Sequence, residues 1–177
     1  APLANHWYHA PLSNALIGRD LTPGKADPGY QLPPYNDDIS AAFNSELGKP
    51  GCLTGSFWYY GLDNGATGTQ IDFLNTFLHE GAHGLGFVTG VSRVSGAKLL
   101  GYDDALMAHL VRFGATPPGF PEMSNSQRLA AMTSGSELQW TGSGIATVIS
   151  LLTAGWTPAG NVEMYAPTTG VSGSAMS

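Results

Sequence analysis

The chain has 177 residues, of which 42% are hydrophobic, and carries 13 acidic against 7 basic side chains for a formal net charge of −6. The length and the apolar content predict a single globular domain with a buried core and exclude a disordered chain. The scarcity of Lys and Arg argues against nucleic acid or an anionic membrane as partner, because both are bound through basic side chains.

The N-terminal sequence and the composition indicate a secreted or periplasmic protein. A chain that begins with Ala1 is typical of a mature protein whose signal segment, with any pro-segment, has been removed. No apolar run reaches the roughly 18 residues that would span a membrane, so no transmembrane segment is expected. Cys52 is the single cysteine, which excludes a disulfide within the chain, and we expect a half-buried thiol that packs as a small hydrophobe.

Short elements are expected before the most informative part of the sequence. An amphipathic helix is predicted around residues 10–18, ending near Gly18, and the turn-rich residues 25–37 predict a loop. The stretch DISAAFNSEL, residues 38–47, favours a strand over a helix. The aromatic run in GSFWYYGL, residues 55–62, predicts a second strand, followed by a loop over residues 63–70.

A helix is predicted from Asp72 to Leu85. Asp72 or Thr69 can cap its start, and glycines at 84 and 86 end it. The apolar stripe, which should pack on the core, consists of Leu74, Leu78, Ala82 and Leu85. The polar stripe, which should line a cleft, consists of Asp72, Thr76, His79 and His83.

The stretch FLHEGAHGLGF, residues 77–87, predicts a zinc site on this helix. His79 and His83 are four residues apart, so their Cβ atoms lie about 5–6 Å from each other on one face. Two imidazoles so placed can reach one ion at the roughly 2.0–2.1 Å of a Zn–N bond. Glu80 points beside the ion, where a carboxylate can take a proton from water without occupying a ligand position. We therefore predict His79 and His83 as ligands of Zn²⁺ and Glu80 as the catalytic base.

The motif HEGAHGLGF resembles the H-E-x-x-H-x-x-G of the metzincin metallopeptidases. Within them it is most similar to the leishmanolysin-like branch and its secreted bacterial members, which have H-E-x-x-H-x-L-G-F and then a long insertion before the third histidine. Further stretches resemble those bacterial proteins: WYHAPLSNALIGRDL, AAFNSEL, CLTGSFWYYGLD and VEMYAPTTGVSGSAMS. The resemblance implies an α+β metzincin-like domain over residues 1–177, with a twisted mixed sheet. Residues 1–87 would form its N-terminal part with the active-site helix, and residues 88–177 the insertion.

The third zinc ligand stays open. The usual metzincin position is Thr89, whose neutral hydroxyl is a poor zinc ligand. Five candidates lie elsewhere in the chain: His6, His9, Asp103, Asp104 and His109. In the bacterial proteins a small-residue run like GVSGSAMS directly precedes the third histidine, so the resemblance favours a ligand just after Ser177, on a C-terminal continuation or a cleaved fragment. We accordingly expect residues 1–177 alone to bind zinc loosely and to have little activity.

The region after residue 88 carries no second motif. A helix is predicted over residues 124–135, with Ser124 or Asn125 as its cap and Gly135 as its stop. A strand and a buried apolar run are expected in ELQWTGSGIATVISLL, residues 137–152, and a short strand in NVEMYAP, residues 161–167. Arg128 is expected to solubilise its helix and Trp140 to pack in the core. Core or surface positions are also expected for the methionines Met107, Met123, Met132, Met164 and Met176.

The predicted function is that of a secreted zinc endopeptidase that acts on protein or peptide substrates through a zinc-activated water and Glu80. The alternatives are a non-catalytic binding module on a metzincin scaffold, another zinc amide hydrolase, and a globular protein without a metal. Metal analysis combined with cleavage of an unstructured protein such as casein distinguishes them.

Overall fold

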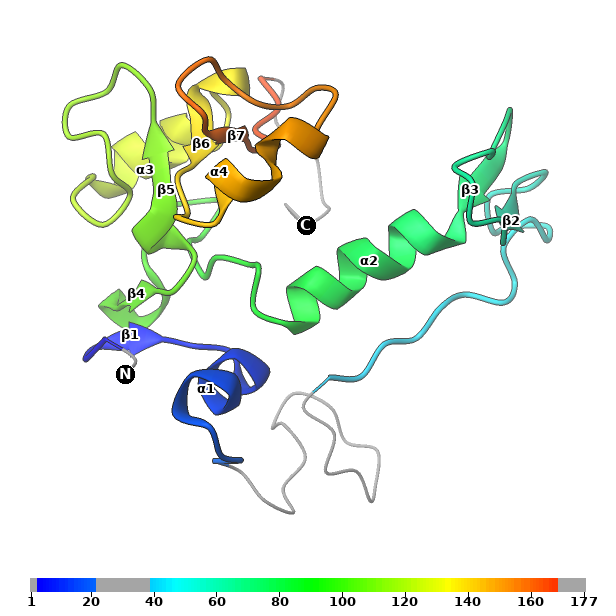
Figure 1. Cartoon of the computed structure of the whole chain (residues 1–177), viewed down its shortest axis with the longest axis horizontal. Helices are drawn as coiled ribbons and strands as arrows, with labels where there is room; N and C mark the ends of the chain where they lie inside the picture. The colour runs from blue at the N-terminus through cyan, green and yellow to red at the C-terminus, as the bar shows by residue number, and fades with distance from the viewer. Residues whose placement is uncertain (1–2, 22–38, 169–177) are drawn as a thin grey trace. The chain divides into compact units, whose positions relative to one another are not determined.

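The computed structural model describes residues 3–21 and 39–168, which fall into two compact units. The motif unit comprises the described residues 9–21 and 39–87, and the core unit comprises residues 3–8 and 88–168. Both consist of short helices and small sheets, so the fold is of the mixed α/β kind (Figure 1). The division after Phe87 falls at the expected start of the insertion. That both units form one catalytic domain stays a prediction.

The motif unit contains two helices and one small sheet. Its elements are α1 (Ala10–Ile17), β2 (Phe57–Tyr59), β3 (Gln70–Asp72) and α2 (Phe73–Gly84). The predicted first helix is confirmed, and it ends at Gly18, whose left-handed φ of 74° suits a residue without Cβ. The predicted strand in the aromatic run is confirmed as β2, but its parallel partner β3 was not predicted: Gln70 was expected in a loop and Asp72 at the start of the helix. The expected loop over residues 25–37 lies outside the described residues.

The start of α2 is confirmed, whereas its predicted packing is wrong. The Asp72 carboxylate accepts a hydrogen bond from the Asn75 backbone N–H at 2.9 Å, which makes Asp72 the N-cap. No residue of α2 is fully buried; of the apolar stripe, Leu74 and Ala82 are half-buried, whereas Leu78 is 58% and Leu85 61% exposed. The helix packs instead through Phe73, near its first turn.

An aromatic cluster around Phe73 holds this end of the motif unit together. The Phe73 ring lies 5.0 Å from Phe43, 5.2 Å from Tyr60 and 5.5 Å from Trp58, centroid to centroid. Such pairs contribute about 0.5–1.5 kcal/mol each beyond their buried area. The cluster explains why the strand expected over residues 38–47 is wrong. The described part of this stretch, residues 39–47, runs without regular structure into a turn, and Phe43 packs on Phe73 while the Asn44 carbonyl accepts from Trp58 Nε1.

The loop before β3 contains a hydrogen bond that makes stability depend on pH. The Tyr59 hydroxyl donates to the Asp63 carboxylate. That bond, followed by backbone N–H groups including that of Gly65, holds the pKa of Asp63 below its ordinary value. The same bond, followed by burial and the charges of Asp63 and Asp72, raises the pKa of Tyr59.

We expect this pair to stabilise the motif unit between two pH limits. The contribution of Asp63 is present above the unfolded pKa of the carboxyl group and is lost as pH falls through its lower folded pKa. The contribution of Tyr59 is present below the unfolded pKa of the phenol and is lost as pH rises through its higher folded pKa. In the Tyr59→Phe variant, NMR titration should find the pKa of Asp63 raised towards its ordinary value. Tyr60→Phe, the neighbouring control, should leave it unchanged; an unchanged pKa in both variants would contradict the assignment.

The core unit is built from strands and helical turns of a few residues each. Its elements in chain order are β1 (His6–Trp7), η1 (Leu99–Gly101), β4 (Asp103–Asp104), η2 (Met107–His109), β5 (Leu110–Arg112), α3 (Asn125–Ala131), η3 (Gly135–Glu137), β6 (Leu138–Trp140), α4 (Ile145–Val148), η4 (Ile149–Leu151) and β7 (Val162–Glu163). β1 and β4 pair in parallel, while β5, β6 and β7 form an antiparallel sheet. Instead of the one twisted mixed sheet expected, the described residues form three separate sheets of two, two and three strands.

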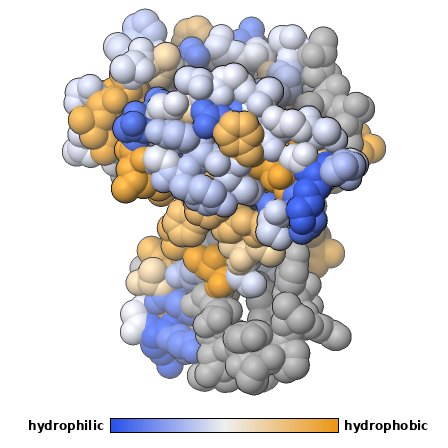
Figure 2. Space-filling model, turned by 90° about the vertical axis from the view of Figure 1, so that its right-hand side faces the viewer, coloured by the Kyte–Doolittle hydropathy of each residue, from blue (hydrophilic) through white to orange (hydrophobic). Residues whose placement is uncertain are grey.

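The predictions for the insertion are confirmed in part. α3 is capped by Ser124, whose side chain accepts from the Gln127 N–H, and the strands expected in residues 137–152 and 161–167 are β6 and β7. The apolar run after β6 is mostly not buried: Ile145 is, but Val148, Leu151 and Leu152 are exposed. Exposed apolar side chains recur across the surface, where orange atoms lie among white and blue ones (Figure 2).

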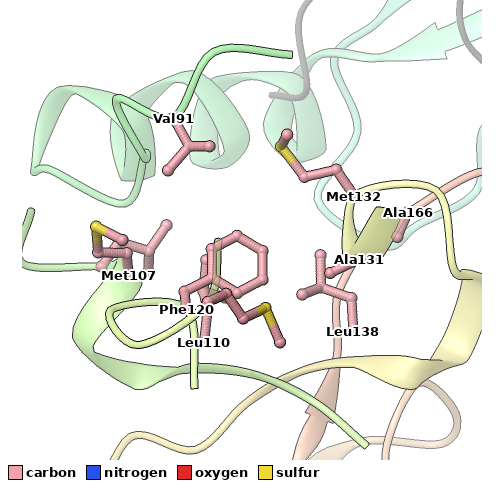
Figure 3. Close-up of a cluster of buried hydrophobic side chains, with 10 residues drawn as sticks. Val91, Met107, Leu110, Phe120, Ala131, Met132, Leu138 and Ala166 are labelled. Atoms are coloured by element: carbon pink, nitrogen blue, oxygen red, sulfur yellow. The ribbon is translucent and has the colours of Figure 1, made fainter. Parts of the chain in front are cut away.

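The hydrophobic core gathers around Phe120. Phe120 and Met107 are fully buried and Leu138 is 1% exposed, and the three are packed together with Leu110 and Ala131 (Figure 3). The predicted roles of the methionines are confirmed for Met107, Met123 and Met132 in the core and for Met164 packed against it, while Met176 lies outside the described residues. No helix among the described residues is long and apolar enough to cross a membrane.

Candidate functional site

Two imidazole rings meet on the exposed side of the last turns of α2. The Nε2 atoms of His79 and His83 are 3.1 Å apart, with ring centroids 4.6 Å apart and ring planes at 87°. The i, i+4 spacing on a regular helix brings them together, as predicted. Glu80 follows His79 directly and is exposed to solvent. The two Nε2 atoms therefore face each other at hydrogen-bonding distance, and Glu80 is adjacent to the pair in the sequence.

The chain after α2 fixes the orientation of the second ring. Nδ1 of His83 lies 2.8 Å from the carbonyl oxygen of Phe87. A carbonyl only accepts, so Nδ1 carries the proton and Nε2 of the neutral ring keeps its lone pair. In metal sites, a contact of this kind from the other ring nitrogen to a backbone carbonyl orients the ligand histidine. This role of Phe87 was not predictable from its residue type, because the contact is made by its backbone carbonyl and not by its side chain.

Gly86 makes the turn that returns the Phe87 carbonyl to the helix. Its φ is 101°, and a Cβ there would lie 3.3 Å from the Cβ of His9 and 3.4 Å from that of Leu12.

We expect Gly86→Ala to lower the free energy of unfolding by about 1–2 kcal/mol, since the backbone conformation disfavours a side chain. Gly81→Ala is the matched control inside the same motif. Nothing lies within 4 Å of its added Cβ, so it should stabilise the helix by roughly 0.5–1 kcal/mol.

Urea unfolding of the two variants tests this prediction, because Gly86→Ala should lower the free energy of unfolding whereas Gly81→Ala should raise it. If Gly86→Ala is as stable as the original protein, the turn does not require a glycine.

The histidine pair fits two corners of a zinc site. Two nitrogens bound to one zinc in tetrahedral geometry lie about 3.3 Å apart, close to the 3.1 Å between these Nε2 atoms. The donor atoms are also of the right type, because neutral imidazole is a common zinc ligand. Within residues 3–21 and 39–168, however, no three His, Cys, Asp or Glu side chains come together as a metal-binding group. The described donor set is therefore two histidines.

The two aspartates considered as a third ligand already have hydrogen-bonding or charged partners. Asp104 is buried; its Oδ2 accepts from the Thr89 hydroxyl at 2.7 Å and its Oδ1 from the Met107 N–H at 2.8 Å. Thr89, at the usual metzincin position, thus binds a carboxylate. Asp103 forms an ion pair with Lys98 at 2.6 Å.

The other three histidines also have local contacts. Nδ1 of His6 lies 2.9 Å from the Ala4 carbonyl oxygen, and His109 is exposed with its ring 6.4 Å from that of Trp140. His9 is the N-cap of α1 and belongs to the motif unit together with the histidine pair. Cys52 is half-buried as predicted and accepts a hydrogen bond at 3.0 Å from the side-chain amide of Asn44.

Comparisons with known proteins found no relative of this chain. No family model, no curated protein and no solved structure matches the chain. The case for a function therefore rests on the motif and its geometry.

Proposed function

We propose that this protein is a secreted zinc-dependent endopeptidase of the leishmanolysin-like, metzincin type. The observation that carries the proposal is the pair of Nε2 atoms 3.1 Å apart on α2, with Glu80 adjacent in sequence. The substrate is a protein or peptide. The chain is acidic and poor in basic side chains, which fits an extracellular location and argues against a nucleic-acid partner.

In this proposal each residue of the motif has one task. His79 and His83 hold the ion through Nε2, and the Phe87 carbonyl keeps the His83 ring in the orientation and tautomer that leave this atom free. When bound, zinc supplies a Lewis acid that polarises the peptide carbonyl and makes water lose a proton near neutral pH. The Glu80 carboxylate would take that proton as the water oxygen attacks the carbonyl carbon, and would return it to the amine nitrogen as the C–N bond breaks.

A third ligand completes the site, since catalytic zinc is usually held by three protein side chains. The resemblance favours a histidine on a continuation of the chain. Among the described candidates Asp104 is the poorest, because both of its oxygens already accept hydrogen bonds inside the core unit. His6, His9, Asp103 and His109 remain the residues to substitute if the 177-residue chain holds zinc through dialysis.

The test combines metal analysis with cleavage of casein, before and after treatment with a chelator. The proposal expects one zinc per active protein, loss of cleavage on chelation and recovery when zinc is restored. Zinc binding without cleavage of casein, but with hydrolysis of small amides, would favour an amide hydrolase. Stoichiometric zinc with neither activity would favour a binding module.

A further inference from the structure

A cavity of ≈ 380 Å³ lies in the core unit, formed by residues that the proposed peptidase mechanism does not use. Its walls include Phe113, Glu137, Gln139, Thr157, Pro158 and Glu163. The volume is within the range that small ligands or single side chains occupy. Every lining residue belongs to the same compact unit, so the cavity is complete without the motif unit.

Sheet pairing sets the arrangement of these walls. Gln139 on β6 is the direct partner of Glu163 on β7, so their side chains lie next to each other on one face of the sheet. Phe113 follows β5 and donates its backbone N–H to the Glu137 carbonyl at 2.8 Å, which brings it beside the start of β6. Leu138, which lies between Glu137 of η3 and Gln139 of β6, is part of the hydrophobic core.

Two buried polar residues of the cavity lining, Gln139 and Thr157, are both hydrogen-bonded to Asn161. Gln139 is 5% and Thr157 9% exposed. Asn161 donates its side-chain N–H to Gln139 Oε1 at 3.0 Å and its backbone N–H to Thr157 Oγ1 at 3.2 Å. These bonds fix both side chains, so the cavity is organised before any ligand enters.

Two carboxylates line the cavity, and among the described residues one of them is in an ion pair and the other is not. Glu137 forms an ion pair with Arg112, with 2.8 Å between Nε and Oε2. Glu163 takes part in none of the ion pairs found among the described residues. A neutral apolar ligand would remove water from the Glu163 carboxylate without giving it a partner, which costs free energy. A ligand with a positive charge avoids that cost, whereas an anion would be repelled.

The remaining walls favour a cation with an apolar stem. The Phe113 ring is 67% exposed, so its face is open to a cation, and Pro158 adds a second apolar surface. Lysine and arginine side chains combine an apolar stem with a charged end. We infer that this cavity binds a lysine or arginine side chain of a peptide or protein, with Glu163 and Phe113 as the groups that recognise the positive charge. The inference needs no metal and does not depend on the proposed peptidase activity.

Binding of single amino-acid derivatives to the full chain tests this inference. The probes are the acetyl, methylamide derivatives of arginine and lysine, with the norleucine derivative as a neutral analogue of the lysine stem. NMR titration should show that the two cations shift the resonances of the cavity residues and that norleucine binds several-fold more weakly. Glu163→Gln and Phe113→Leu should each weaken binding of the cations by about two- to five-fold.

Glu122→Gln is the matched control, since it removes the same charge from an exposed glutamate of the core unit that does not line the cavity. It should leave the affinity unchanged. Equal binding of the norleucine and lysine derivatives would overturn the inference, as would cation affinity that is unaffected in both Glu163→Gln and Phe113→Leu. Unchanged thermal unfolding of the variants shows that any loss of binding is local.

Discussion

Replacing Glu80 by glutamine is expected to lower kcat/KM for a peptide substrate by about 10²–10⁴-fold, the usual contribution of a positioned acid–base group. Glutamine has nearly the same shape as glutamate but does not accept a proton, so attack of water loses its base and the departing amine its acid. Zinc content should stay the same, because in the proposed mechanism Glu80 acts as the base and occupies no ligand position. The measurements are peptide cleavage and zinc per protein after dialysis, made on a chain that includes the third ligand, since residues 1–177 alone are expected to bind zinc loosely and to have little activity.

Two further variants make this result specific. His83→Ala should lose cleavage and zinc together, since it removes one of the two described donors. Glu46→Gln, which removes an exposed carboxylate of the same unit that pairs with Lys49, should change neither. Full activity in Glu80→Gln would reject the assignment of the base, and zinc loss there would make Glu80 a ligand.

Elements with strong local signals were predictable from the sequence. The helix over the histidine motif begins where Asp72 can cap it, and α1 ends at a glycine in the left-handed region, as expected. α3 was also predicted with its serine cap, and the structure adds a capping box between Ser124 and Gln127. In each case the determining contacts join residues a few positions apart. A short stretch of sequence therefore contains both partners of each of these contacts.

Features that depend on distant partners were not predictable. β3 forms only because residues 70–72 lie beside β2, and nothing in their composition indicates a strand. Phe43 was assigned to a strand because its neighbours suit one, but its ring packs on Phe73, 30 positions further along the chain. The apolar stripe of α2 likewise required a packed layer against it, which the motif unit does not provide within its described residues.

In the candidate site, too, the feature set by local spacing was predictable and the features that depend on other segments were not. The spacing of His79 and His83 fixed their convergence, because four residues make slightly more than one helical turn. The contact of His83 with the Phe87 carbonyl depends on the backbone turn at Gly86, for which the glycine was the signal. A third ligand depends on which distant segment reaches the pair, and spacing along the chain does not determine that.

Arg128 shows how a surface residue type can be misread. Its position on α3 predicted a solubilising side chain, but it is 3% exposed, and its guanidinium donates to backbone carbonyls. Nε reaches the Gly96 carbonyl at 2.7 Å, and Nη1 reaches those of Phe120, at 3.1 Å, and Met123. Burial lowers the pKa of the guanidinium, while the charge of Asp103 acts in the opposite direction. The side chain thus connects two loop segments around the core, one at Gly96 and one over residues 120–123.

Arg128→Met is expected to lower the free energy of unfolding of the core unit by about 3–5 kcal/mol, which is a large effect for a single substitution. Methionine keeps most of the apolar stem but leaves three carbonyls without their donor, and each buried unpaired group costs about 1–3 kcal/mol. Arg112→Met is the matched control: it breaks the half-exposed ion pair with Glu137 and should cost at most about 1 kcal/mol. Arg128→Lys should fall between the two, because an ammonium group cannot span the same carbonyls as the planar guanidinium. Urea unfolding followed by a core-unit probe measures all three, and equal stabilities for Arg128→Met and Arg112→Met would show that the buried network does not hold the loops together.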